Sequence, residues 1–170
     1  KSTSIELTDK PDYRIAERRS ELLKRDQVPG YDGTRYEVAR IEATAGDGTL
    51  VPVTLFHRRG LARDGRNPAL LRGYGAYGIP QAAGFDPNLI SLLERGFVVA
   101  IAHVRGGGDL GKPWHDQGRM AAKMNTFTDF IACAEHLLRS GYGSQERLVG
   151  QGGSAGGLLM GAVTNLRPDL

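Results

Sequence analysis

One serine stands in a sequence setting that could make it a nucleophile. Residues 152–156 read Gly-Gly-Ser-Ala-Gly, so Ser154 is the centre of a G-x-S-x-G pattern between a predicted strand and a predicted helix. A sharp turn at that place lifts the serine hydroxyl above the edge of a sheet, and small flanking residues let the backbone turn. The helix N-terminus adds positive potential, with the N–H of Ala155 as the first donor to a developing oxyanion. We therefore predict acyl transfer at Ser154, with an ordinary glycine-rich turn as the alternative.

A nucleophilic serine needs a base, and in hydrolases with this serine turn an acidic residue and then a histidine follow the serine. All four histidines precede Ser154, and we assign a catalytic role to none of them; they are His57, His103, His115 and His136. The acidic residue that follows, Asp169, is too close in sequence to be the usual third member. Either the base lies beyond Leu170 or the hydrolase interpretation fails. The chain starts at Lys1 without an initiator Met and stops just after a predicted helix, which favours the first option.

Two glycine-rich segments raise the alternative of a nucleotide site. Residues 73–78 (GYGAYG) and 106–111 (GGGDLG) both match G-x-G-x-x-G after a predicted strand. A dinucleotide site also requires a helix to begin at once and an acidic residue to end the next strand. Here Pro80 and Pro113 follow the two matches. We predict that both segments are instead loops on the ligand-binding face of a sheet.

The elements that must position these residues alternate between apolar runs and helical patterns. Period-two alternation on both sides of a Gly-Asp-Gly turn predicts a β-hairpin, and continuous apolar runs predict buried strands. The expected strands are 36–43, 50–56, 68–71, 97–104 and 148–150, and the expected helices are 88–95, 127–138 with Asn125 or Thr126 as its cap, and 155–165. Strands that alternate with helices predict an α/β fold, with a mostly parallel sheet covered on both faces and an N-terminal β-hairpin.

Composition argues against several classes of protein. The 170 residues carry a net charge of +3, but the basic residues are dispersed or paired, without the basic and aromatic run of a nucleic-acid-binding face. The longest apolar run, 97–102, is far shorter than the ~20 residues that span a bilayer. The single cysteine, Cys133, cannot form an internal disulfide, so we expect a reduced, cytoplasmic compartment. We expect no nucleic-acid partner, no membrane partner, no metal and no cofactor.

Four motifs in order resemble the prolyl oligopeptidase family of serine peptidases. They are residues 73–78, 105–111 (RGGGDLG), 125–127 (NTF) and 152–157 (GGSAGG), within a similarity that covers about 21–170. Residues 102–108 and 153–168 are most similar to the oligopeptidase B branch of the family. The resemblance implies an incomplete α/β-hydrolase fold, in which residues 29–170 form the N-terminal part of the peptidase domain. Residues 1–28 would then be the end of a β-propeller and a linker.

The same resemblance implies roles for individual residues. Ser154 would be acylated, and the hydroxyl of Tyr74 would be the second oxyanion donor beside the Ala155 N–H. Tyr77 would help line the pocket for the residue before the scissile bond, and Arg105 is a candidate for substrate contact. The implied substrates are short peptides cut after Arg or Lys, and the implied partners are a propeller and a C-terminal catalytic segment of the same polypeptide. The 170 residues alone would lack the triad Asp and His and would turn over no substrate.

Other interpretations stay open at this point. Tyr74 and Tyr77 could be packed loop aromatics, and Arg105 and Asp109 could brace their own loop. The acidic residue by which the family recognises a basic side chain would lie downstream of this chain. Cleavage after proline, removal of acyl-amino acids and ester hydrolysis are therefore alternatives within the enzyme class. A non-catalytic α/β module that binds peptides or nucleotides is a further alternative.

Overall fold

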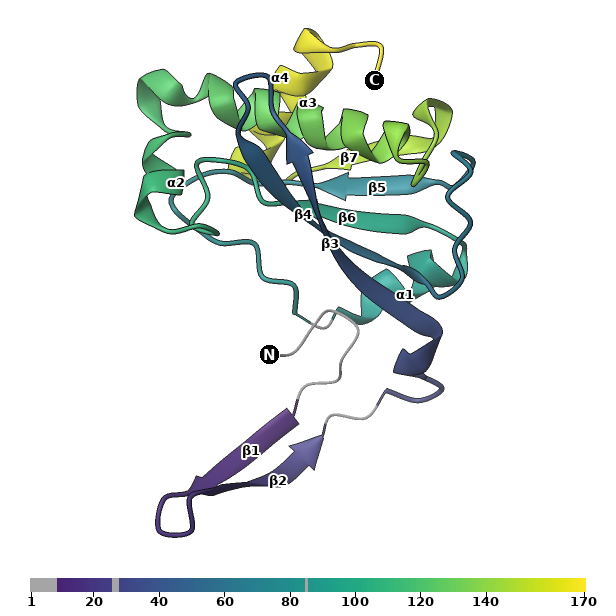
Figure 1. Ribbon diagram of the computed structural model, residues 1–170, viewed down its shortest axis with the longest axis vertical. Helices are drawn as coiled ribbons and strands as arrows, with labels where there is room; N and C mark the ends of the chain where they lie inside the picture. Colours follow the sequence, from purple (N-terminus) through teal and green to yellow (C-terminus); the bar gives the residue numbers. More distant parts are fainter. Residues whose placement is uncertain (1–8, 26–27, 85) are drawn as a thin grey trace.

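The computed structural model describes residues 9–25, 28–84 and 86–170 (Figure 1). Most of them form a body with helices on both faces of a five-stranded sheet, and a two-stranded hairpin lies apart from that sheet. The predicted propeller end at 1–28 falls partly outside the described ranges. Its described part is an antiparallel hairpin of β1 (Asp9–Arg14) and β2 (Arg19–Arg25). The assignment of this hairpin to a propeller stays a prediction.

The five-stranded sheet combines an antiparallel hairpin with parallel strands. The hairpin is β3 (Tyr36–Thr44) and β4 (Leu50–Arg58), and the other strands are β5 (Ala69–Arg72), β6 (Val98–Ala102) and β7 (Leu148–Gln151). Their order is β3-β4-β6-β5-β7, with β5 parallel to β6 and β7, and β4 antiparallel to β3 and β6. The predicted strands are confirmed. The predicted parallel pairing is found among β5, β6 and β7, and the predicted hairpin joins them through the antiparallel β4, so the sheet is mixed.

Helices cover both faces of this sheet, as the apolar strands predicted. Figure 1 shows α3 (Met124–Arg139) and α4 (Ala155–Leu166) on one side of it and α1 (Pro87–Glu94) on the other. Along β6, Val98, Ala100 and Ala102 belong to the core that includes residues of α3 and α4. Val99 and Ile101 belong to the core that includes residues of α1. Successive side chains of a strand point to opposite faces, so one short strand contributes to two cores.

The start of α3 differs from the prediction. The helix begins at Met124, so neither Asn125 nor Thr126 is its cap. Thr126 lies in the first helical turn, is fully buried, and donates its hydroxyl proton to the backbone oxygen of Arg105 at 2.7 Å. The hydroxyl that could have capped the helix therefore satisfies a buried carbonyl of a neighbouring loop. Such a partner comes from tertiary packing, which a local capping pattern does not contain.

Candidate active site

Ser154 occupies a strained turn between a strand and a helix. β7 ends at Gln151, α4 begins at Ala155, and Ser154 between them adopts φ 54° and ψ −120°. A left-handed backbone at a non-glycine residue costs on the order of 1–3 kcal/mol and persists only where the surroundings impose it. The serine is exposed. The structure thus confirms the predicted strand–turn–helix context and presents the hydroxyl at the carboxyl end of the sheet.

The two glycines of the G-x-S-x-G pattern are required by space. A Cβ atom on Gly152 would lie 2.2 Å from the backbone oxygen of Gly156. A Cβ atom on Gly156 would lie 2.7 Å from the backbone oxygen of Gly73. The neighbouring Gly153 and Gly157 have open space at the same position. Only side-chain-free residues at 152 and 156 allow the turn to close and α4 to approach the loop after β5.

Tyr74 lies beside this turn. The N–H of Gly73 donates to the oxygen of Gln151 at 3.0 Å, which carries the parallel β5–β7 pairing one residue further. The Cβ position of Gly156 is 3.6 Å from both Cα and Cδ2 of Tyr74, so the tyrosine borders the first turn of α4. Within the described ranges, no protein group hydrogen bonds with the Tyr74 hydroxyl. As the first residue of α4, Ala155 has no intrahelical acceptor for its N–H.

Tyr77 sits on the same loop but faces solvent. Its side chain is 75% exposed, and its φ of 57° is left-handed. Tyr77 is three residues from Tyr74, the predicted oxyanion donor, and its side chain is accessible to a ligand. Its role in lining a substrate pocket stays a prediction.

The two G-x-G-x-x-G segments pack against each other. The N–H of Gly78 donates to the oxygen of Gly106 at 3.1 Å. A Cβ atom on Gly106 would lie 2.2 Å from the oxygen of Gly75, and one on Gly108 would lie 2.1 Å from the oxygen of Gly78. These glycines therefore permit contact between two backbones. No helix begins directly after Gly78. The helix that begins directly after Gly111, α2 (Lys112–Asp116), is only five residues long. This use of the glycines favours the loop interpretation over a dinucleotide site.

Arg105 forms a buried ionic brace. Its side chain is 3% exposed and donates through Nε and Nη2 to Asp129, which is fully buried, and through Nη1 to Asp47 in the hairpin turn. The carboxylates raise the pKa of Arg105, and its hydrogen bond lowers the pKa of Asp47 to about 2. Each guanidinium nitrogen is thus engaged within the protein. This arrangement favours the bracing role, and substrate contact by Arg105 stays a prediction.

His103 and His115 hydrogen bond with groups other than Ser154. His103 Nδ1 and Asp109 Oδ1 are 2.6 Å apart, and both side chains are buried. The N–H of Gln81 also donates to this carboxylate, so Asp109 braces its loop. His115 Nδ1 lies 2.8 Å from the backbone oxygen of Gly106. Among the described residues, no histidine hydrogen bonds with Ser154, and the absence of a catalytic role for the four histidines stays a prediction.

Sequence reasoning missed two residues of this region, Asp129 and Lys123. Asp129 lies off the helical face predicted through Phe127, Phe130 and Leu137, and its one signal is the small apolar pair Ala132 and Cys133 at positions i+3 and i+4. Lys123 gave no such signal, since it precedes the helical pattern and resembles an ordinary surface lysine. In the structure it is half-buried, and its ammonium group donates to the oxygen of Gly75 at 2.6 Å.

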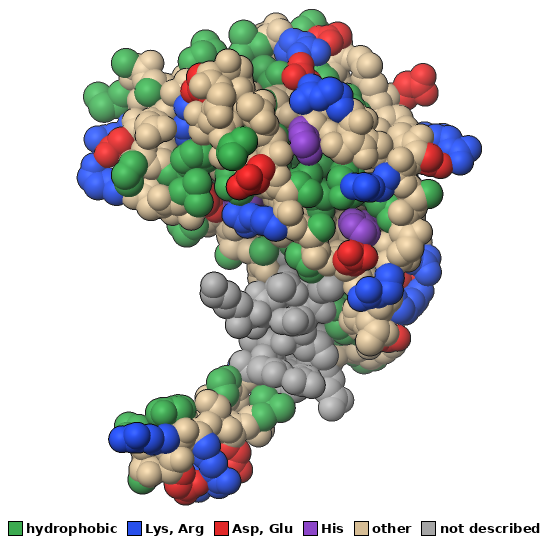
Figure 2. Space-filling model, viewed as in Figure 1, with side chains coloured by type: hydrophobic (Ala, Val, Ile, Leu, Met, Phe, Trp, Pro, Cys, Tyr) green, Lys and Arg blue, Asp and Glu red, His purple; other side chains and the backbone are tan. Residues whose placement is uncertain are grey.

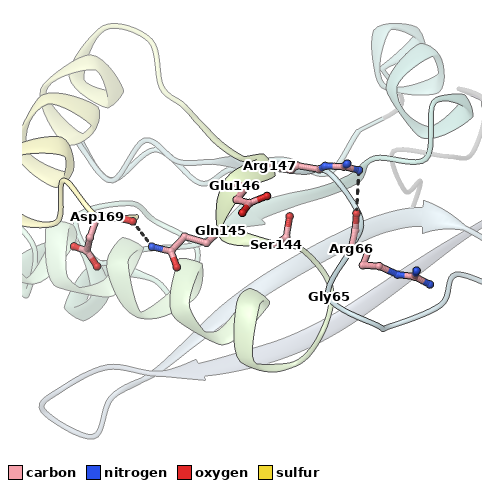
Figure 3. A pocket seen from close by; sticks show the side chains of 7 residues that line it. All are labelled: Gly65, Arg66, Ser144, Gln145, Glu146, Arg147 and Asp169. Carbon is pink, nitrogen blue, oxygen red and sulfur yellow. Dashed lines mark hydrogen bonds between the residues drawn. The ribbon is translucent and has the colours of Figure 1, made fainter.

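A large open hollow lies at the other end of the sheet. Its lining residues precede β5 and β7 or follow α4, whereas Ser154 follows β7 (Figure 3); they are Gly65, Arg66, Ser144, Gln145, Glu146, Arg147 and Asp169. On the face drawn in Figure 2, basic side chains are interspersed with acidic ones. The described residues contain no helix able to cross a membrane and no group of three or more His, Cys, Asp or Glu able to hold a metal.

Comparison with known proteins agrees with the site geometry. The model of the prolyl oligopeptidase family matches residues 83–170, which is more than half of the chain. The chain therefore belongs to the prolyl oligopeptidase family.

Several individual proteins are similar to most of the chain. Dipeptidyl aminopeptidase BI of Pseudoxanthomonas mexicana is 46% identical over 169 residues, which are 99% of this chain and 22% of that protein. Protease 2 of Moraxella lacunata is 44% identical over 140 residues, 82% of this chain and 20% of that protein. The structure of oligopeptidase B from Trypanosoma brucei with covalently bound antipain matches with a TM-score of 0.94 and 42% identity, over 99% of this chain and 24% of its own. The chain thus spans about a fifth of the length of these curated relatives.

Proposed function

We propose that this chain contributes the nucleophile and the oxyanion donors of a serine peptidase that hydrolyses short peptides after Arg or Lys. The observation that carries the proposal is the strained turn at Ser154, with Tyr74 bordering the helix that follows. A left-handed serine held by two sterically required glycines fits the demands of a nucleophile and has no evident benefit for a simple turn.

The proposed reaction is acyl transfer in two steps. Ser154 Oγ attacks the peptide carbonyl carbon and loses its proton to a general base, while the Ala155 N–H and the Tyr74 hydroxyl donate to the oxyanion. The base returns the proton to the leaving amine as the C–N bond breaks. Water then attacks the ester on Ser154, which releases the acid and restores the hydroxyl. A histidine and an acidic residue outside these 170 residues are the proposed base and its partner, so the 170 residues alone would be inactive.

The relatives support more than one specificity. The similarity to an oligopeptidase B structure agrees with the branch of the family that the sequence motifs resemble, and from that resemblance we propose cleavage after Arg or Lys with Tyr77 in the pocket for that residue. The relative named dipeptidyl aminopeptidase BI supports a second candidate, removal of dipeptides from a free N-terminus. Structures of prolyl endopeptidases, one with 39% identity, keep cleavage after proline as an alternative.

Four small substrates can distinguish these specificities in the full-length protein. They are an N-blocked arginyl amide, an N-blocked prolyl amide, an unblocked dipeptidyl amide ending in arginine, and a short aliphatic ester. We expect the highest kcat/KM for the blocked arginyl amide. A strong preference for the unblocked dipeptide would replace the proposal by the second candidate, and a preference for proline or the ester would replace the basic specificity.

Labelling by a fluorophosphonate tests the nucleophile directly. The full-length protein should be labelled on Ser154, and Ser154→Ala should lose both the label and about 10⁶-fold in kcat, as triad nucleophile replacements do. Ser144→Ala, in the hollow at the opposite end of the sheet, is the matched control and should keep both. An unlabelled, inactive full-length protein would leave only the non-catalytic binding interpretation.

A further inference from the structure

Lys123 contacts the loop that carries Tyr74 but has no role in the proposed mechanism. It precedes α3, and its ammonium group donates to the oxygen of Gly75 at 2.6 Å and to the hydroxyl of Thr126 at 3.2 Å. Its Nζ also lies 5.8 Å from the centre of the Phe127 ring, within reach of a cation–π interaction. The lysine thus ties the start of α3 to the loop of residues 73–78, which we call the oxyanion loop.

This ammonium group has no carboxylate partner. Within the part of the chain that the structure describes, Lys123 forms no ion pair, and burial lowers its pKa. A half-buried charge that is held only by a carbonyl, a hydroxyl and a ring face is an expensive way to stabilise a fold. An apolar side chain of similar length would avoid that desolvation cost but would leave the buried Gly75 carbonyl without its donor. The reason for keeping this ammonium group therefore lies with the carbonyl that it satisfies.

The oxyanion loop offers that reason. Gly75, Tyr77 and Gly78 all have positive φ, so the loop departs from extended backbone at three places. Its ends are fixed by the bond from Gly73 to Gln151 and by the bond from Gly78 to Gly106. Between these ends, the bond from Lys123 reaches the carbonyl of Gly75, one residue beyond Tyr74.

The Cα of Gly75 is also closely packed. A Cβ atom on Gly75 would lie 2.3 Å from Cγ2 of Thr126 and 2.7 Å from Cγ2 of Val104. The same Thr126 donates to the oxygen of Arg105, so α3 touches both glycine-rich loops through adjacent groups. The middle of the oxyanion loop is thus pressed onto a buried surface and held there by the lysine.

We propose that Lys123 is a positioning residue that holds the hydroxyl of Tyr74 at the oxyanion, acting through the Gly75 carbonyl. The proposal rests on the proposed function, since it assumes that Tyr74 is an oxyanion donor. A displacement on the order of 1 Å at a reacting group can lower a rate by about 10²-fold. The loss of this one tie should therefore reduce kcat and leave KM nearly unchanged, with a lower unfolding temperature because the Gly75 carbonyl loses its donor.

A double-mutant cycle in the full-length protein tests this role. The variants are Lys123→Met, which keeps the apolar stem and removes the donors, Tyr74→Phe, and the two combined. Lys123→Arg retains a charged donor, and Lys112→Met, which loses only an exposed pair with Asp116, is the matched control. Each variant is measured for kcat, for KM and for its thermal unfolding temperature.

We expect Lys123→Met to lower kcat by about 10- to 100-fold in the native background and by less than about twofold in the Tyr74→Phe background. Lys123→Arg should recover part of the loss, and Lys112→Met should be indistinguishable from the native protein. Equal losses in both backgrounds, or no loss at all, would overturn the role of Lys123 and leave the proposed function intact. A Tyr74→Phe variant with native kcat would instead contradict the oxyanion assignment in the proposed function.

Discussion

The two ends of the five-stranded sheet are built differently. At the carboxyl end, the backbones of three glycine-rich turns approach one another so closely that side chains would collide, and the Arg105–Asp129 pair is buried. At the amino end, the charges around the hollow lie in water; Arg66, for example, is 84% exposed in its pair with Asp64. Buried polar interactions and backbone strain are thus concentrated at the carboxyl end, where the three glycine-rich turns must keep fixed positions relative to one another. This difference can be tested by making the same chemical change at both ends.

The largest contrast is expected between the two ionic pairs. Asp129→Asn should destabilise the full-length protein by about 3–5 kcal/mol, because it leaves the buried guanidinium of Arg105 without its main counter-charge. Asp64→Asn should leave the unfolding temperature unchanged within error, because the pair of Asp64 is exposed and screened. Thermal unfolding of both variants gives the comparison. Equal shifts would show that the buried brace has no special importance.

The next contrast concerns two adjacent glycines of α4. Gly156→Ala should lower stability by roughly 1–3 kcal/mol and reduce activity, because its methyl group would displace the oxygen of Gly73. Gly157→Ala meets open space in the same helix and should raise stability by about 0.4–1 kcal/mol. Unfolding temperature and kcat of the two variants decide the point. A neutral Gly156→Ala would mean that the loop after β5 can move away freely.

A smaller effect should reveal the strain at the nucleophile. Ser154→Gly should abolish turnover and yet raise stability by about 1 kcal/mol, because glycine adopts φ 54° without penalty. Ser144→Gly at the amino end should slightly lower stability, since Ser144 has an unstrained φ of −111°. Calorimetry of the two variants checks the opposite signs. A destabilised Ser154→Gly would indicate that the turn stores no strain.

The smallest expected effect is a pH dependence of the stability that the pair of Arg105 with the exposed Asp47 contributes. The hydrogen bond from Arg105 holds the pKa of Asp47 at about 2, below the ~3.9 of an aspartate in an unfolded chain. The pair therefore contributes fully above about pH 4, and its contribution is lost as the pH falls towards 2. The difference in unfolding temperature between native protein and Asp47→Asn should shrink over that range. A difference that stays constant with pH would exclude an ionic origin.

Sequence reasoning succeeded where the determining interactions are local. The predicted strands, the helix over 155–165 and the serine turn are found because apolar periodicity and glycine placement act over a few residues. It failed at Thr126, which looks like a cap and instead bonds to the oxygen of Arg105. It also missed the antiparallel pairing of β4 with β6, because no local pattern states which strand becomes a neighbour.

The sequence by itself determined the nucleophile candidate, the strand–turn–helix around it and the family, since each depends on residues that are close together in the chain. Only the tertiary structure decided what surrounds the serine. It placed Tyr74 against α4, committed Arg105 to two carboxylates and brought the ammonium of Lys123 to the oxyanion loop. These contacts join residues 24 to 82 positions apart, and their geometry follows from how the strands and helices pack, which short-range patterns do not encode.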